Sequence, residues 1–180
     1  MLNFIFKFLT VFFSLFFLIA LHIGLSYILP FPFSKINIIF IFLIIFLMWK
    51  DSGLIVWISF LIHFALELYS TTPFGVILFS STISTLLIFW LYKNFFTNRS
   101  WYSAMTLVFL LSLFYRFFYI FFLKVIDLIK GIDLSWNLIY ITSFWEILLT
   151  AITTAIIYLL LSILIKEFKK PEIKKGIFKI

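Results

Sequence analysis

The chain has 180 residues, of which 65% are hydrophobic and 12% are charged, and its formal net charge is +7. An ordinary soluble domain carries about 25% charged residues, so this composition excludes a water-soluble domain with a charged surface. The sequence contains no cysteine, which excludes disulfide bonds, thiolate metal sites and thiol catalysis. We therefore expect an integral membrane protein with little mass outside the bilayer.

Apolar runs of helical length follow one another along the chain. A bilayer core of about 30 Å requires about 20 helical residues, and continuous apolar runs do not have the alternating pattern of membrane β-strands. The six runs cover residues 8–29, 36–49, 53–69, 74–92, 101–123 and 138–165. The second run is short, so residues 36–69 could instead form one broken hairpin that bends at residues 50–53. The expected fold is all-α, a polytopic transmembrane bundle of about six helices in a single domain, residues 1–180.

The distribution of lysine and arginine predicts which side of the membrane each connection faces. If both termini are cytoplasmic, the outer side carries only Lys35, Lys124 and Lys130. The cytoplasmic side then carries Lys7, Lys50, Lys93, Arg99, Lys166, Lys169, Lys170, Lys174, Lys175 and Lys179. This asymmetry follows the positive-inside rule and requires an even number of spans. We expect a multi-pass protein of the bacterial inner membrane.

Residues 166–180 form a basic tail that also contains apolar side chains. Nucleic-acid binding is not expected, because the basic residues lie beside membrane runs. Contact with anionic lipid headgroups fits better, at about 1 kcal/mol for each basic residue near the surface. The lysines assigned to this contact are Lys166, Lys169, Lys170, Lys174 and Lys175. A simpler interpretation of the same residues is a topology anchor.

Five ionisable residues lie within the predicted spans: His22, His63, Glu67, Arg116 and Glu146. A charge at the centre of a membrane helix costs about 2.5 to 3.5 kcal/mol on insertion scales, so such residues mark candidate sites. The predicted topology places all five in the outer half of the membrane, and the i to i+4 spacing puts His63 and Glu67 on one helix face. Arg116 requires a counter-ion, either Glu67 or, if its side chain bends inward, Glu146. We expect an outer polar cluster that links the third, fifth and sixth helices.

The role of this cluster is open at this point. It could be an interhelical ion pair that fixes packing, a ligand pocket open to the outside, or a contact for a partner's transmembrane helix. A metal site is not expected, because His63 and Glu67 supply two ligands where catalytic zinc usually has three. Small residues also occur in pairs four apart, Ala20 with Gly24 and Ala151 with Ala155. Such pairs allow close helix contact, mostly within one protein.

Catalysis and cofactors are not expected. His63 and Glu67 do not form the zinc-protease pattern, in which a Glu directly follows the first of two histidines. The sequence has no G-x-S-x-G elbow and no aspartate pair within the spans. The longest pieces outside the spans, residues 124–137 and the tail, are each about 15 residues, which is far too few for a domain core.

The residues around Glu67 follow a recognisable pattern. A short apolar helix leads through a polar break into a helix that starts at Gly53 and ends in Glu67, followed by the polar turn 70–72, Pro73 and Gly75. Pro73 is suited to preset the turn, and Gly75 allows the next helix to start close to its neighbour. Through this pattern the stretch from residue 35 to about residue 136 resembles the MreD family, a small membrane subunit of the bacterial rod-shape elongation machinery.

The resemblance implies a non-enzymatic scaffold that binds an MreC-type bitopic membrane protein. Through that partner it would contact the actin-like filament and the cell-wall synthases, a polymerase and a transpeptidase. The substrate-binding subunits of energy-coupling-factor vitamin transporters are similarly small, six-helix and basic, and are thought to share the MreD fold. In that alternative the polar cluster would be a vitamin pocket that opens to the outside.

Overall fold

All regular secondary structure in the described part of the chain is helical. The computed structural model describes residues 2–96, 100–131 and 135–164, with side chains from residue 13 onward. Its helices are α1 (Leu2–Ile28), the short 3-10 helix η1 (Phe33–Lys35), α2 (Ile38–Lys50), α3 (Leu54–Leu68), α4 (Val76–Phe95), α5 (Trp101–Lys130) and α6 (Trp136–Leu164). No strand occurs in these residues, and the expected all-α fold is confirmed.

Three helices are long and apolar enough to cross a membrane, as judged by length and composition: α4 with 20 residues, α5 with 30 and α6 with 29. By contrast, α2 has 13 residues and α3 has 15. The short α2 was expected, whereas α3 is shorter than predicted because Gly53 and Tyr69 lie outside the helix. The run 36–69 is divided at Asp51, which ends α2 in the left-handed conformation with φ of 47°.

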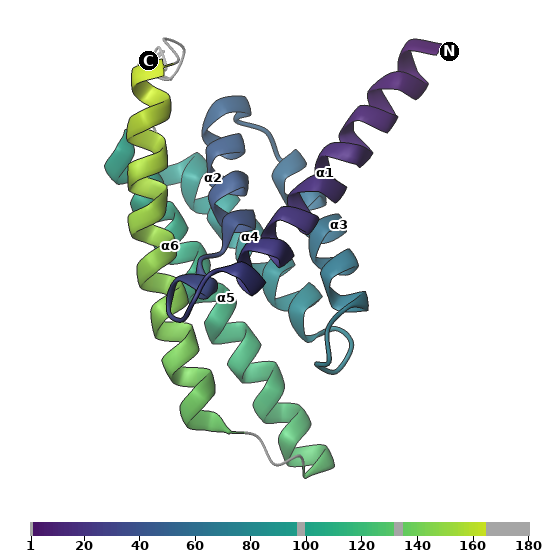
Figure 1. Cartoon of the computed structure of the whole chain (residues 1–180), viewed down its shortest axis with the longest axis vertical. Helices are drawn as coiled ribbons and strands as arrows, with labels where there is room; N and C mark the ends of the chain where they lie inside the picture. Colours follow the sequence, from purple (N-terminus) through teal and green to yellow (C-terminus); the bar gives the residue numbers. More distant parts are fainter. Residues whose placement is uncertain (1, 97–99, 132–134, 165–180) are drawn as a thin grey trace, which may run out of the picture.

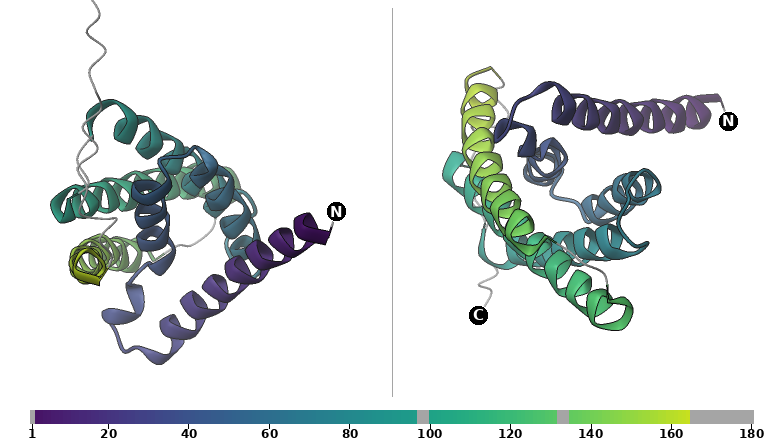
Figure 2. Two further views of the ribbon diagram at one scale, coloured as in Figure 1. Left: turned by 90° about the horizontal axis from the view of Figure 1, so that it is seen from above. Right: turned by 60° about the horizontal axis from the view of Figure 1, so that its bottom comes forward.

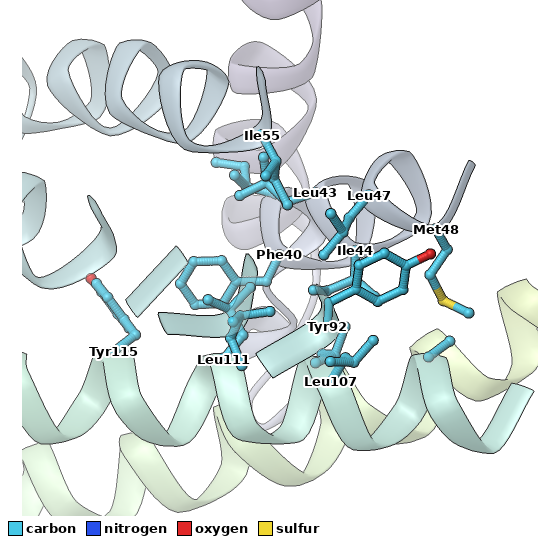
Figure 3. Packing of buried hydrophobic residues seen from close by; sticks show 14 of the residues in the cluster. Phe40, Leu43, Ile44, Leu47, Met48, Ile55, Tyr92, Leu107, Leu111 and Tyr115 are labelled. Carbon is cyan, nitrogen blue, oxygen red and sulfur yellow. The ribbon is translucent and has the colours of Figure 1, made fainter. Parts of the chain in front are cut away.

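The second helix, α2, forms the centre of the bundle. It is apolar on all sides, and a helix with this pattern belongs in a surrounded position. Its fully buried side chains are Ile39, Phe40, Leu43, Ile44, Leu47 and Met48, each at 0% exposure. Figure 3 shows several of them packed against Leu107 and Leu111 of α5. The core therefore lies where α2 meets α5, and α3, α4 and α6 pack around it.

The first helix, α1, leans away from the other five. In Figures 1 and 2 its N-terminal half extends beyond the rest of the bundle, and its side chains Phe13, Phe16 and Phe17 are exposed. The start of α1 and the end of α6 lie at the same end of the molecule (Figure 1), which we call the terminal end. The opposite end is called the distal end. The predicted headgroup contacts in the tail lie outside the described residues.

The connection between the last two helices corrects one expectation. Residues 124–137 were predicted to be a linker, but α5 continues to Lys130 and α6 begins at Trp136. The apolar side chains of residues 125, 128 and 129 prolong the helical pattern of α5. Gly131 then ends the helix in the left-handed conformation with φ of 60°, and its N–H donates to the Asp127 carbonyl at 2.7 Å. Most of the predicted linker is therefore helix.

Candidate functional site

The carboxylate of Glu67 caps the start of α4. It lies at the distal end of α3 and is only 4% exposed. Its Oε1 accepts hydrogen bonds from the backbone N–H groups of Gly75 at 2.7 Å and Ile77 at 3.0 Å, and its Oε2 accepts one from Leu78 at 3.3 Å. The first N–H groups of a helix have no partner within the helix, and the helix dipole favours a negative charge there. Glu67 therefore joins α3 to α4.

The turn between these helices is shaped by its own residues. Ser70 Oγ lies 2.6 Å from Thr72 Oγ1 and accepts a hydrogen bond from the Thr72 N–H at 3.0 Å. Gly75 adopts φ of +99°, and a Cβ at this position would stand 3.1 Å from the Phe79 ring. The positive φ favours glycine, and any larger residue would also have to displace the Phe79 ring slightly. Because Gly75 has no side chain with which to cap α4, the cap comes from Glu67, eight residues earlier. We refer to Glu67, the turn 70–74 and Gly75 as the clasp.

Arg116 of α5 forms an ion pair with Glu146 of α6. The two side chains are 16% and 6% exposed, and the guanidinium carbon also lies 5.3 Å from the centre of the Tyr119 ring. The Asn37 side-chain amide donates to Glu146 Oε1 at 3.0 Å. The two oxygens of Glu146 thus bind two different partners, as a buried carboxylate needs.

Asn37 connects this pair to α2. Its Oδ1 accepts the Phe40 N–H at 3.2 Å and so caps α2, while its own N–H donates to Thr150 Oγ1 at 3.0 Å. A single asparagine therefore fixes the start of α2 against two successive turns of α6. We call Asn37, Arg116, Glu146 and Thr150 the distal network.

The expected cluster is divided into two parts, and the first choice of counter-ion was wrong. Glu67 is engaged in the clasp and Arg116 pairs with Glu146, the second choice. The physical reason is competition for Glu67: three backbone N–H groups at the start of α4 occupy its carboxylate. Sequence spacing places residues along a helix axis but gives no information on which neighbouring helix offers the nearest donor.

Neither histidine forms an ion pair among the described residues, although His22 lies close enough to Glu146 to interact with its charge. His63 is 2% exposed, and its Nδ1 donates to the Ser59 carbonyl at 2.8 Å. Its ring packs 5.6 Å from Phe40 and 6.3 Å from Tyr115, measured between ring centres. His22 lies on α1, and its buried Nδ1 has no hydrogen-bond partner within the described residues. Both histidines fit the interpretation of core residues better than that of ligands.

Aromatic side chains occupy the space between the two parts. The Phe40 ring is fully buried and lies 5.1 Å from the Tyr115 ring (Figure 3). Two clefts occur elsewhere, one of about 340 Å³ between α1 and α3 and one of about 350 Å³ between α1, α2 and α6. Both are lined mainly by apolar side chains, and neither is lined by any of the five predicted site residues.

Sequence reasoning did not assign Asn37, Ser59, Thr85 or Thr150 to the polar cluster, although Thr150 lies beside the small-residue pair of Ala151 and Ala155. Asn37 directly precedes an apolar run, which is the usual signal of a helix N-cap. Thr150 follows Glu146 by one helical turn and so shares its face. Ser59 and Thr85 join α3 to α4 through hydroxyl groups 2.9 Å apart, and short polar side chains in a membrane run are typical of helix contacts.

The two small-residue pairs differ in use. In α6, Ala151 is 3% exposed and its neighbours Thr150 and Thr154 are fully buried, so this pair serves internal packing. In α1, Ala20 is exposed and a Cβ on Gly24 would meet no heavy atom within 4 Å. The α1 pair is therefore not used within the described protein.

Fold and site together define a class: a helical membrane protein in which buried polar side chains join neighbouring helices. Among the described residues, no three His, Asp or Glu side chains are grouped as metal ligands. No family model matches the chain, and no curated protein or solved structure matches it.

Proposed function

We propose that this protein is a non-enzymatic scaffold subunit of the bacterial cell-shape elongation machinery, a multi-pass protein of the inner membrane. Its partner would be an MreC-type bitopic membrane protein, and through it the cell-wall synthases. The lysines of the tail would contact anionic lipids. The observation that carries the proposal is the clasp, because its residues are those through which the sequence resembles the MreD family.

The clasp supplies a physical reason for the spacing in that pattern. An acidic residue at the end of one helix reaches the first N–H groups of the next, and the polar turn brings the two helix ends together. Glycine at the eighth position permits φ of +99°. Each residue of the pattern thus has a structural role in one compact unit, and this supports the resemblance more strongly than the sequence pattern alone.

The polar interior supports a scaffold over a small-molecule carrier. Arg116 and Glu146 neutralise each other, Glu67 is occupied by backbone donors, and Phe40 fills the space beside His63. A ligand site normally needs a cavity with a few convergent polar groups. The two clefts described above are lined mainly by apolar residues, so the vitamin-transporter alternative finds no support in them.

The outward face of α1 offers a place for a partner helix. Phe17, Ala20 and Gly24 recur at spacings of three and four, and this side of α1 points away from the bundle. Small residues four apart allow two helix backbones to approach closely in a membrane. A bitopic partner has a single transmembrane helix, and such a helix fits this face.

Recovery of partners from native membranes tests the proposal. The tagged protein would be extracted in mild detergent, and a tagged multi-pass protein of another class serves as control. We expect an MreC-like protein and wall synthases to be enriched over the control. Recovery of a coupling subunit with ATPases instead would overturn the proposal in favour of the transporter alternative.

The natural lack of cysteine makes the contact face testable as well. A photoreactive maleimide on Ala20→Cys should crosslink the same partner that the pull-down recovers. The matched control is Ile152→Cys on α6, which is 44% exposed and should label lipid only. Equal crosslinking from both positions would contradict the assignment to α1.

A further inference from the structure

One of the two clefts combines an apolar interior with a positive charge at one end. It has a volume of about 350 Å³ and lies between α1, the α1–α2 connection, the start of α2 and α6. Ligand pockets range from about 300 to 1,000 Å³, so this cleft has room for one slender group. Its lining along α1 runs from Leu21 to Leu29, which is about 12 Å at the rise of a helix. The cleft is therefore suited to an extended chain.

The hydroxyl groups inside the cleft are bonded to their own helices. Ser26 Oγ donates to the Ile23 carbonyl at 2.7 Å, and Thr153 Oγ1 donates to the Leu149 carbonyl at 2.7 Å. The other lining residues on the helices are leucines and isoleucines. A polar ligand buried against such walls would have unpaired polar groups, which is costly. The interior of the cleft thus suits a hydrocarbon chain.

The α1–α2 connection forms one end of the cleft and is held in place by the protein. Ser34 and Ile36 line the cleft, and Lys35 stands between them in the chain. The connection lies beside α6 (Figure 1). There the Phe31 ring packs edge-on against Trp145, with ring centres 6.3 Å apart. The distal network fixes the start of α2, so this end of the cleft is preformed.

The charge of Lys35 is not compensated by the described residues around it. No acidic residue precedes Asp51 in the sequence, and Asp51 lies at the opposite end of α2, where it pairs with Lys93 at 2.7 Å. Glu146 is the only acidic residue of α6, and it already pairs with Arg116. Lys35 is half-buried and forms no ion pair among the described residues. A negatively charged group therefore complements this end of the cleft.

We propose that the cleft binds an anionic phospholipid, with one acyl chain in the apolar interior and the phosphate at Lys35 and the Ser34 hydroxyl. Ammonium and hydroxyl groups both donate hydrogen bonds to phosphate oxygens. Lipid chains in a membrane are already in hydrocarbon, so the chain adds little preference and the charge selects the headgroup. One basic residue contributes about 1 kcal/mol, or about a fivefold preference for phosphatidylglycerol over zwitterionic phosphatidylcholine. This inference does not depend on the proposed partner.

The second cleft, between α1 and α3, offers an internal control. It has a similar volume of about 340 Å³ and an apolar lining that includes Leu61 and Ala65. No lysine or arginine lines it, and none occurs in residues 51–92. An acyl chain can enter this cleft as well, but no charge is present there to select its headgroup.

Photo-crosslinking with two lipid probes tests the proposal. The full chain would be reconstituted in phosphatidylcholine vesicles with a trace of phosphatidylglycerol or phosphatidylcholine that carries a diazirine in its acyl chain. Mass spectrometry of the peptides then locates the crosslinks. At Leu21, Leu25 and Ile157 we expect about fivefold more labelling by the phosphatidylglycerol probe than by the phosphatidylcholine probe. At Leu61 and Ala65 the two probes should label equally.

Substitutions of Lys35 show whether its charge is the cause. Lys35→Gln should reduce the labelling ratio to about one, and Lys35→Arg should retain it, because only the first removes the charge. The matched control is Lys124→Gln, which removes an exposed lysine of α5 and should leave the ratio unchanged. Gel filtration in detergent checks that each variant retains its fold.

Three outcomes would overturn the proposal. The first is equal labelling by the two probes at Leu21, Leu25 and Ile157 in the unaltered chain. The second is an equal preference for phosphatidylglycerol at both clefts. The third is a loss of preference in Lys124→Gln as large as that in Lys35→Gln. The last two would show that the overall charge of the protein, and not Lys35, attracts the anionic lipid.

Discussion

The backbone N–H of Gly75 donates a 2.7 Å hydrogen bond to the carboxylate of Glu67, eight residues earlier in the chain. The acid of one helix thereby supplies the cap that a glycine at the start of the next cannot supply. One N-cap residue usually supplies both the backbone conformation at the helix start and the side chain that accepts the hydrogen bonds. Here Gly75 supplies the conformation and Glu67, on the preceding helix, supplies the acceptor. This division joins α3 to α4 at their polar turn.

Replacing Glu67 by Gln should destabilise the protein by about 2 kcal/mol, since hydrogen bonds to a charged acceptor contribute about 1.5 to 3 kcal/mol. Glutamine keeps one acceptor oxygen, whereas the structure has three donors at the two oxygens of Glu67. The free energy of unfolding would be measured by titration with sodium dodecyl sulfate in mixed micelles. Glu67→Asp retains the charge and should lose less stability. If both variants lose the same amount, the negative charge of Glu67 does not account for the stability of the cap.

Glycines 75 and 24 form a matched pair for the effect of a single methyl group. Gly75→Ala should cost about 2 kcal/mol, because φ is +99° and the new Cβ would meet the Phe79 ring at 3.1 Å. Gly24→Ala should instead be neutral or stabilise by up to about 1 kcal/mol, because α1 is helical there and nothing lies within 4 Å. Thermal denaturation of both variants in one detergent distinguishes the two effects. If Gly24→Ala loses as much stability as Gly75→Ala, the backbone conformations assigned to these two glycines are wrong.

The sequence was sufficient to predict the helices wherever an apolar run marks them. Apolar runs bounded by polar residues predicted the six helices, because backbone groups in lipid must be satisfied within a helix. The prediction failed at residues 124–137, because charged residues after an apolar run indicate the end of a span but not the end of a helix. Lys124, Asp127 and Lys130 instead lie within the last turns of α5, since a helix can continue past the apolar core until a residue such as Gly131 ends it.

The candidate site was less predictable, for a reason that Arg116 illustrates. The need for a counter-ion follows from its own chemistry, and both candidates were acidic residues at similar depth. The choice depended on which helix packs against α5 and on the prior engagement of Glu67 with backbone donors. Those are tertiary facts, as is the role of Asn37, whose amide reaches an acid more than a hundred residues away in sequence.

Substitutions of Asn37 should separate the stability that comes from the α2 cap from the stability that comes from the hydrogen bond to Glu146. Asn37→Ser preserves the α2 cap, because serine is also a good N-cap residue, but removes the donor to Glu146. Asn37→Ala removes both and should lose about 1 kcal/mol more than the serine variant. Asn37→Asp preserves the cap yet places a carboxylate beside Glu146, and should be the least stable of the three near neutral pH. The comparison is made by detergent titration; if the aspartate variant is as stable as the serine variant, Glu146 does not face residue 37.

The pairing of Arg116 with Glu146 is open to a direct test by two double-mutant cycles. Arg116→Gln and Glu146→Gln should each cost about 3 kcal/mol, because either change leaves a charge buried without its partner. The double variant removes both charges and should be at least about 1 kcal/mol more stable than the sum of the single losses predicts. The control cycle combines Arg116→Gln with Glu67→Gln, whose contacts are separate, and should be additive within about 0.5 kcal/mol. Unfolding free energies of all five variants and the unaltered chain complete both cycles. Coupling in the control cycle without coupling in the first would restore Glu67 as the counter-ion and contradict the division of the polar residues into a clasp and a distal network.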